Sequence, residues 1–305
     1  MSRRTSGRDL DGVLLVDKPQ GPTSFDVVKR VERALRARKA GHTGTLDPMA
    51  TGLLVICLGQ ATRLVPYLTA ANKRYRAVVR LGIATDTLDA EGQVVRTDAP
   101  EAVAAVDRAA IEAVLPRFRG VIEQRPPAFS AIRVDGQRLH ERARAGEVVE
   151  APLRTVQIDA LTLEDVRLPD FEITVTASKG TYIRSLGADI AGALGLGGHL
   201  VALRREACLP FEVARALTLE AIEADPEAAE PHLMSAAQAL EGLPVVWLDA
   251  GAAADLRHGR KRAFPEAPIG PCRALDASGQ LVAIIEAAGA EPAIILRGFA
   301  ASGLP

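Results

Sequence analysis

Apolar and polar side chains alternate with two different periods along this chain of 305 residues. A period of two over residues 75–81 places Tyr75 and three aliphatic side chains on one face, which predicts a strand with one buried side. The continuous apolar run Leu53–Leu58 predicts a strand buried on both faces. Further strands are predicted at 155–161, 171–177 and 201–205.

Helical spacing occurs in three other segments. Residues 25–35 carry an apolar stripe that begins with Phe25, and Ser24 is the predicted N-cap of this helix. Residues 103–115 predict a second helix. The segment Gly180–Arg184 opens a third, with a buried stripe formed by Ile183, Leu186, Ile190 and Leu194.

The order of these elements predicts the fold class. Strands and helices mix without regular βαβ alternation, which favours an α+β fold over a doubly wound one. Prolines, glycines and arginines dominate residues 119–152, so we expect a long excursion from the sheet that is mobile without a ligand. A break at 223–231 and a link at 242–244 precede short strands predicted at 245–248, 274–276, 281–286 and 293–299.

Composition describes an ordinary globular protein, with 48% apolar and 25% charged residues. No apolar run approaches the roughly 18 residues of a membrane span, and the polar N-terminus lacks the apolar core of a signal peptide. We therefore expect a cytoplasmic protein. Cys57, Cys208 and Cys272 lie far apart in the sequence, which disfavours a disulfide framework or zinc ribbon and indicates small buried side chains.

The formal net charge of -1 conceals an uneven distribution of charge. Residues 1–80 carry 15 Lys and Arg against 6 Asp and Glu, and residues 117–144 carry 7 against 3. Residues 204–257 carry 4 against 10. This asymmetry favours a polyanionic partner, although a basic run is more often only a solvated face.

Residues 41–52, GHTGTLDPMATG, place one carboxylate, Asp47, in a loop of small and turn-forming residues. Such a loop lets the backbone approach a ligand closely, and the apolar strand that follows would hold it rigidly. Asp47 is therefore a candidate catalytic group. The alternative is a turn residue, because an Asp before Pro in a glycine-rich loop is more often that.

Six segments, in this order and spacing, resemble the bacterial tRNA pseudouridine(55) synthases of the TruB family. They are Gly12–Ser24 (GVLLVDKPQGPTS), Ala40–Leu54 (AGHTGTLDPMATGLL), Lys73–Gly82 (KRYRAVVRLG), Thr85–Gly92 (TDTLDAEG), Gly180–Leu186 (GTYIRSL) and Ala202–Arg205 (ALRR). The resemblance implies a pseudouridine synthase fold, with a mixed, mainly antiparallel sheet and flanking helices, over residues 1–242. Residues 243–305, with a basic cluster at 257–262, more weakly resemble a PUA-like RNA-binding module.

The implied activity is isomerisation of uridine 55 in the tRNA T loop to pseudouridine, without cofactor or metal. The C1′–N1 bond breaks, the uracil rotates, and a C1′–C5 bond forms. A carboxylate near C1′ serves as nucleophile or as base at C2′, and the resemblance assigns it to Asp47. It assigns stacking on the base and proton removal at C5 to Tyr75. Arg184 would hold Asp47 ionised, with Asp89 completing the network.

Four further residues receive substrate roles from the resemblance. Tyr182 and Leu203 would line the uracil pocket, and Lys18 would lie by the cleft. His42 would enter the T loop and help hold the target nucleotide out of the stack. Three of these residues also have an ordinary structural explanation: Tyr182 as a helix-start aromatic, Leu203 as a core aliphatic and His42 as a surface histidine.

Residues 124–152 correspond to the thumb that the family places against the T loop. Phe129 stands where Tyr is usual and Arg133 where Lys is usual, so we expect altered hydrogen bonds to RNA there with stacking retained. The implied partner is the T arm of tRNA. No protein partner or membrane is implied, and we expect a monomer.

Two other classes of protein remain open. A metal hydrolase would use Asp47, Asp86 and Asp89, but the five histidines are scattered and no HxH or HExxH spacing is present. The second class is a tRNA-binding folding chaperone, in which isomerisation is a secondary activity. Because opening the T loop is part of the reaction, that role is compatible with catalysis.

Overall fold

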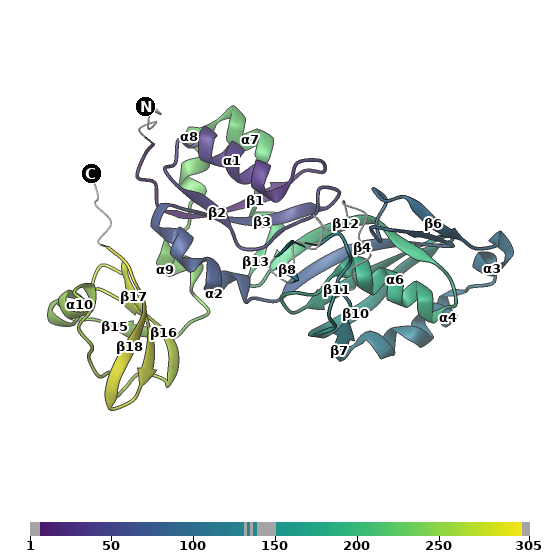
Figure 1. The fold of residues 1–305 in the computed structure, drawn as a ribbon. Coiled ribbons are helices and arrows are strands. Elements are labelled where there is room, and N and C mark those ends of the chain that lie inside the picture. The colour runs from purple at the N-terminus through teal and green to yellow at the C-terminus, as the bar shows by residue number, and fades with distance from the viewer. Residues whose placement is uncertain (1–6, 131–132, 135–136, 139–150, 301–305) are drawn as a thin grey trace.

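The computed structural model describes residues 7–130, 133–134, 137–138 and 151–300. A large sheet with helices on its faces occupies most of the molecule, and a small second sheet lies at one end (Figure 1). The arrangement confirms the predicted α+β class. In the described residues, no helix is long and apolar enough to cross a membrane.

The large sheet is mixed and mainly antiparallel, as predicted. Within the described residues, the β14–β1 and β3–β12 pairings are parallel and its other pairings are antiparallel. β2 (Ala40–His42) pairs with β3, and β13 (Phe211–Glu212) pairs with β12. The remaining strands run in the spatial order β14 (Leu217–Thr218), β1 (Gly12–Lys18), β3 (Thr51–Leu58), β12 (Gly198–Cys208), β4 (Lys73–Leu81), β11 (Asp170–Ala177), β10 (Arg154–Arg167) and β7 (Gly120–Gln124).

Helices and two small hairpins surround this sheet. The hairpins are β5 (Ile83–Thr85) with β6 (Val94–Thr97), and β8 (Arg133–Val134) with β9 (Gln137–Arg138). The helices of the same part are α1 (Ser24–Ala34), α2 (Val65–Thr69), α3 (Pro100–Ala104), α4 (Arg108–Val114), α6 (Ile183–Ala193), α7 (Leu219–Ala224), α8 (Pro226–Ala229) and α9 (Ala236–Ala239). Short 3-10 turns lie at 59–64, 115–118, 213–215 and 230–232.

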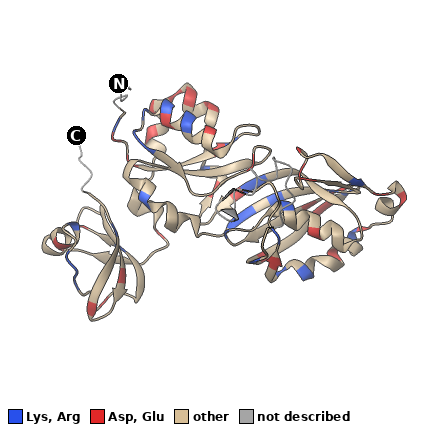
Figure 2. Cartoon of the chain, in the orientation of Figure 1, with Lys and Arg blue, Asp and Glu red and all other residues tan. Residues whose placement is uncertain are grey.

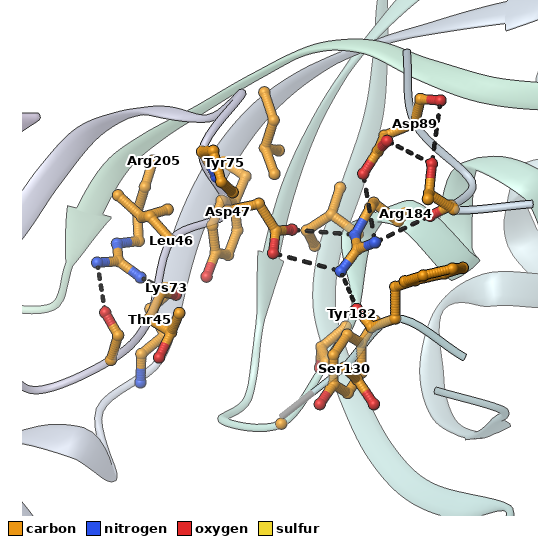
Figure 3. Close-up of a pocket in the computed structure, with 18 of the residues that line it drawn as sticks. Thr45, Leu46, Asp47, Lys73, Tyr75, Asp89, Ser130, Tyr182, Arg184 and Arg205 are labelled. Carbon is orange, nitrogen blue, oxygen red and sulfur yellow. Dashed lines mark hydrogen bonds and ion pairs between the residues drawn. The ribbon is translucent and has the colours of Figure 1, made fainter. Parts of the chain in front are cut away.

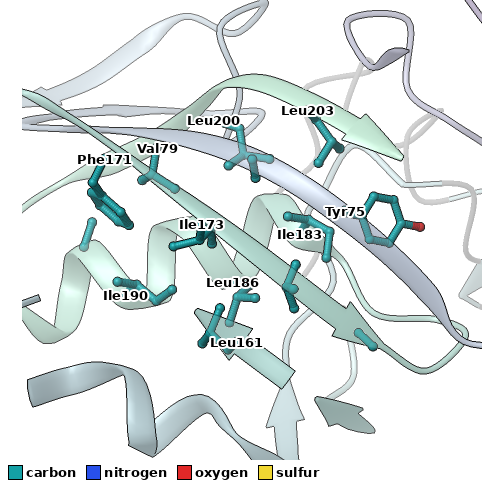
Figure 4. Packing of buried hydrophobic residues seen from close by; sticks show 14 of the residues in the cluster. Tyr75, Val79, Leu161, Phe171, Ile173, Ile183, Leu186, Ile190, Leu200 and Leu203 are labelled. Atoms are coloured by element: carbon teal, nitrogen blue, oxygen red, sulfur yellow. The ribbon is translucent and has the colours of Figure 1, made fainter. Parts of the chain in front are cut away.

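The packing of α6 on the sheet confirms two of the predicted patterns. The alternating positions of β4 are buried from Tyr75 to Leu81, as period-two spacing requires. Ile183, Leu186 and Ile190 form the buried stripe of α6 (Figure 4). This shared core fixes the start of α6 against β4, and both elements supply side chains to the site described below.

The prediction for the first helix was partly wrong. Thr23, not Ser24, is the N-cap, and it forms a capping box with Asp26. Phe25 is 62% exposed. The apolar stripe begins two residues later, with Val27, Val28, Val31 and Leu35, because Ser24 turns inward to bond a loop backbone.

Three boundaries also differ from the predictions. The helix expected at 103–115 is split, because Asp107 caps a new helix, α4, with its side chain. The expected break at 223–231 lies largely in α7 and α8. Leu219 and Ile222 of α7 and Ala229 of α8 share a core cluster with α1. Residues 120–124 of the expected excursion form β7, and the helical piece predicted at 139–145 lies outside the described residues.

The second sheet confirms the strands predicted near the C-terminus. It runs in the order β15 (Val245–Trp247), β16 (Gly270–Leu275), β17 (Leu281–Ala288) and β18 (Glu291–Gly298), with α10 (Ala250–Arg257) beside it. Leu281 and Phe299 belong to the same apolar cluster as Leu64 and Leu68 of the first part of the chain. The Arg63 guanidinium donates to the Gly298 carbonyl at 2.8 Å. The two sheets are thus packed together.

All three cysteines are free and buried, as expected for small core side chains.

Candidate active site

The loop between β2 and β3 carries Asp47, and several side chains fix it. The Ser24 hydroxyl accepts from the Leu46 N–H at 2.8 Å and lies 3.1 Å from the Leu46 carbonyl oxygen. The Lys18 ammonium donates to the Pro48 carbonyl at 3.2 Å. Since both neighbours of Asp47 are tied to other elements, its carboxylate has a defined position.

Arg184, at the start of α6, lies between two carboxylates (Figure 3). Its Nε is 3.0 Å from Asp47 Oδ2, and its Nη2 donates to Asp47 Oδ1 at 3.3 Å. Its Nη1 is 3.3 Å from Asp89 Oδ2. The remaining donors reach the carbonyls of Thr87 at 2.9 Å and Phe129 at 3.0 Å. This is the Asp47–Arg184–Asp89 arrangement that the family resemblance implies.

Burial dominates the electrostatics of Asp47. Loss of water raises the pKa of this carboxyl above its ordinary value, while the Arg184 guanidinium opposes the shift and Asp89 adds to it. The expected pairing with Arg184 is present, but the net effect of the surroundings is to raise the pKa of Asp47. The pair nevertheless orients the carboxylate, because two guanidinium nitrogens face its two oxygens.

Tyr75 lies on β4 directly beside Asp47 (Figure 3). Burial raises the pKa of its phenol above the usual value, so the hydroxyl is protonated at neutral pH. The ring, with 9% of its surface exposed, belongs to the core cluster beneath α6 as well as to the site.

These side chains surround a pocket of about 650 Å³. Tyr182 and Leu203 line it, together with Asp47, Tyr75, Asp89 and Arg184. The Gln124 side chain holds the backbone of Tyr182 on both sides, accepting from its N–H at 2.7 Å and donating to its carbonyl at 3.0 Å. Six of the eight predicted site residues therefore meet at one pocket.

Lys18 and His42 are placed differently. Lys18 is fully buried, and its ammonium bonds the carbonyls of Pro19 and Pro22 as well as Pro48. Burial lowers its pKa to about 8. Neither Lys18 nor His42 is among the residues that line the pocket. His42 ends β2, and its buried Nδ1 has no hydrogen-bond partner among the described residues.

Sequence reasoning missed two cations of the pocket, Lys73 and Arg205. Both fall inside segments that carried the family resemblance. Strand alternation places Lys73 on the face of Tyr75 and Arg205 on the face of Leu203, and this signal could have found them. Arg205 is 1% exposed and Lys73 is 6% exposed. In the part of the chain that the structure describes, no carboxylate forms an ion pair with either side chain.

The spatial distribution of charge is more even than the sequence suggests (Figure 2). Arg74, Arg76 and Arg80 of β4 pair with acidic residues contributed by β11, β12 and β13. In the C-terminal basic cluster, Arg257 and Arg260 pair with aspartates. Much of the excess positive charge in residues 1–80 is thus neutralised by the acidic second half of the chain.

Among the described residues, no group of three or more His, Cys, Asp or Glu side chains is arranged to hold a metal ion. The site is instead the partly exposed carboxylate of Asp47, its guanidinium partner, the buried carboxylate of Asp89 and an aromatic platform. Such a set can act on a planar ring held against the aromatic side chain while the carboxylate attacks or takes a proton beside it.

Comparison with known proteins identifies the class. Residues 32–183, which include Asp47, Tyr75 and Asp89, match the model described as "TruB family pseudouridylate synthase (N terminal domain)". The fold and the site thus define a pseudouridine synthase. Near full-length relatives agree, and the chain belongs to the TruB family.

Two such relatives are both described as tRNA pseudouridine synthase B. The protein of Cupriavidus metallidurans is 47% identical over 274 residues, covering 88% of this chain and 86% of the relative. The protein of Pseudomonas aeruginosa is 44% identical over 285 residues, covering 92% of each.

Solved structures support the fold over nearly the whole chain. A chain of an H/ACA RNP bound to a substrate RNA containing 2′-deoxyuridine matches with a TM-score of 0.72 and 27% identity, over 95% of this chain and 85% of that one. A chain of a Cbf5-Nop10-Gar1 complex matches with a TM-score of 0.72 and 29% identity, over 95% and 84%.

Proposed function

We propose that this pseudouridine synthase acts on uridine 55 in the T loop of tRNA, with Asp47 as the catalytic carboxylate. The observation that carries the proposal is the Asp47–Arg184 pair beside the Tyr75 ring, in a pocket large enough for a nucleotide. The names of the relatives, tRNA pseudouridine synthase B, support tRNA as the substrate.

The chemistry requires an ionised, positioned carboxylate and a held base. Asp47 either attacks C1′ or removes the proton from C2′, and in both cases the electron pair of the C1′–N1 bond leaves with the uracil. The uracil rotates against Tyr75 and its C5 bonds to C1′, as the Asp47 carboxylate leaves C1′ in the first route or returns the proton to C2′ in the second. The C5 proton is then lost and N1 ends protonated, so the reaction needs neither a redox partner nor a cofactor.

The remaining predicted residues support substrate binding in this proposal. Tyr182 and Leu203 confine the rotating base, since both line the pocket. Lys18 acts through the Pro48 carbonyl, which it holds next to Asp47. His42 would contact the T loop when the target nucleotide is extruded, because the reacting atoms are inaccessible in a stacked base.

At the level of the whole chain, we propose a catalytic domain over residues 1–242 and a PUA-like RNA-binding domain over residues 243–305. The separate four-stranded sheet from Val245 to Gly298 supports this division. Residues 124–152 would be the thumb against the T arm, although most of them lie outside the described residues. The protein would work in the cytoplasm as a monomer without protein partners.

The test is to map pseudouridine on an unmodified tRNA transcript by carbodiimide labelling and primer extension. We expect one protein-dependent stop, at position 55. Modification at a different position would contradict the substrate assignment. The alternative, a folding chaperone with secondary isomerisation, predicts that a turnover-deficient variant still accelerates tRNA folding, so folding and turnover must be measured on the same samples.

A further inference from the structure

Arg205 on β12 is a buried cation beside the proposed catalytic carboxylate, and nothing above assigns it a role. Its side chain is 1% exposed, which makes it the largest fully buried side chain in the part of the chain that the structure describes. A buried guanidinium without a carboxylate partner is costly unless its donors are satisfied in another way.

Three backbone carbonyls satisfy these donors, and all belong to the segment that carries Asp47. Nη2 donates to Gly44 at 3.1 Å, Nη1 to Thr45 at 3.3 Å and Nε to Leu53 at 2.7 Å. The first two carbonyls precede Asp47 by three and two residues, and the third follows it by six. One side chain therefore joins both ends of the Asp47 loop.

The backbone of Arg205 contacts the same loop. Arg205 is the parallel-strand partner of Gly52. A Cβ at Gly52 would lie 2.2 Å from the Arg205 carbonyl oxygen, and Gly52 has φ +101°, so this close approach requires glycine. The exit of the Asp47 loop is thus fixed by both the main chain and the side chain of one residue.

Arg205 also faces Tyr75. The two residues are directly opposite each other in the antiparallel β12–β4 pair. The guanidinium beside the phenol opposes the burial-driven rise in the pKa of Tyr75. Arg205 consequently contacts both the loop of Asp47 and the strand of Tyr75.

We propose that Arg205 is a positioning residue that sets the distance between the Asp47 carboxylate and the Tyr75 ring. The inference rests on the proposed roles of Asp47 and Tyr75. Misplacing a reacting group by roughly 1 Å can lower a rate about 10²-fold, which is the size of effect that loss of this clamp should give.

The test compares Arg205→Lys and Arg205→Gln with Arg204→Lys. Lysine keeps the positive charge but can make fewer bonds to the carbonyls than arginine. Glutamine keeps an amide donor and carries no charge into the core. Arg204 is the matched control, because it is the adjacent arginine of β12 but pairs with Asp17 at 2.7 Å, with 39% of its side chain exposed. The measurements are single-turnover rate, RNA dissociation constant and melting temperature, with rates taken well below melting.

We expect the single-turnover rate to fall about 10²-fold in Arg205→Lys and further in Arg205→Gln, with RNA affinity within about threefold of wild type. Arg204→Lys should stay near the wild-type rate. Arg205 variants that are folded and react at the wild-type rate would overturn the proposal. Affinity lost in the same proportion as rate would also overturn it, by assigning Arg205 to RNA binding.

A purely structural role is separable as well. If the rate returned to the wild-type value whenever the variant was fully folded, the positioning role would be wrong. Absence of turnover by the wild-type protein, or turnover by Asp47→Asn, would count against the proposed function rather than against Arg205 specifically.

Discussion

At the residue scale, the site depends on two opposed influences on Asp47. Burial and Asp89 raise the pKa of this carboxyl, and Arg184 lowers it. In the proposed reaction Asp47 acts in its ionised form by either route, so activity should be lost as pH falls through the pKa of Asp47 in the folded protein. Because that pKa lies above the ordinary carboxyl value, the loss should begin at a higher pH than for an exposed aspartate.

Two variants should move this pKa in opposite directions. Arg184→Gln removes the stabilising cation and should raise the pKa of Asp47, whereas Asp89→Asn removes a like charge and should lower it. Carbon-13 titration of the aspartate carboxyls measures both without requiring activity, with the Asp47 signal identified from its absence in Asp47→Asn. Shifts in the same direction for both variants would contradict this electrostatic account.

Tyr75 provides a second residue-scale prediction. Its buried phenol is protonated at neutral pH, so it can receive the C5 proton only after giving up its own. If the hydroxyl takes part in proton transfer, Tyr75→Phe should lower the single-turnover rate about 10²-fold or more while keeping RNA affinity. Tyr75→Leu should lower the rate further, because it also removes the ring. A Phe variant with the wild-type rate would restrict Tyr75 to stacking.

At the scale of elements, the attachment of α1 to the Asp47 loop is testable with two adjacent residues. Ser24→Ala leaves the buried Leu46 N–H without its partner, at a cost of about 1–3 kcal/mol, and loosens the loop. Thr23→Ala removes only the helix cap, at a cost of about 1 kcal/mol. Denaturant unfolding should show both variants destabilised.

The activities of these two variants should differ. We expect the rate of Ser24→Ala to fall about tenfold or more, since the bond that it removes lies next to Asp47, and Thr23→Ala to keep the wild-type rate when folded. Equal rates in the two variants would mean that α1 does not help to position the loop.

The helices and strands were largely predictable from the sequence, but the contacts between them were not. Period-two spacing identified β4, and helical spacing identified the buried stripe of α6, because each pattern records which side is buried. Phe25 fitted the helical stripe of α1 but is exposed. Ser24 points inward to bond Leu46, and the side of α1 that faces the core therefore excludes Phe25. Local periodicity contains no information about that loop contact.

The same limit applies to the site. The resemblance identified Asp47, Arg184 and Asp89 because motif order is readable in one dimension. The role of Arg205 depends on a parallel pairing between β12 and β3, whose partners are more than 150 residues apart along the chain. Strand alternation places Arg205 on the same face as Leu203 and Arg204 on the other, but the local sequence does not show which backbone carbonyls the Arg205 guanidinium bonds.

At the scale of the whole molecule, the two sheets share one apolar cluster, which predicts that they unfold together. Phe299, 6% exposed at the end of the second sheet, packs in the cluster that includes Leu64 and Leu68. Phe299→Ala should cost about 3–5 kcal/mol and shift a single unfolding transition. Ile294→Ala, at a position on β18 that is 53% exposed, is the matched control and should have little effect.

Calorimetry distinguishes the two possibilities for this interface. A single transition that moves as a whole in Phe299→Ala is the expected result. Two transitions, of which only one responds to the substitution, would mean that the second sheet is an independent unit and that the shared cluster contributes little to coupling.

The most direct test of the central claim is release of tritium from tRNA labelled at C5 of uridine, since formation of the C1′–C5 bond expels that hydrogen. Asp47→Asn keeps the size of the side chain and removes the carboxylate. Asp170→Asn is the control, because it alters another Asp–Arg pair of the same sheet, with Arg80 at 2.7 Å.

We predict release by the wild-type protein and by Asp170→Asn, and no measurable release by Asp47→Asn even though its tRNA affinity stays within roughly tenfold of wild type. Tritium release by Asp47→Asn at a rate comparable to that of the wild-type protein would contradict the account, because the carboxylate around which this site is built would then not be required for the reaction.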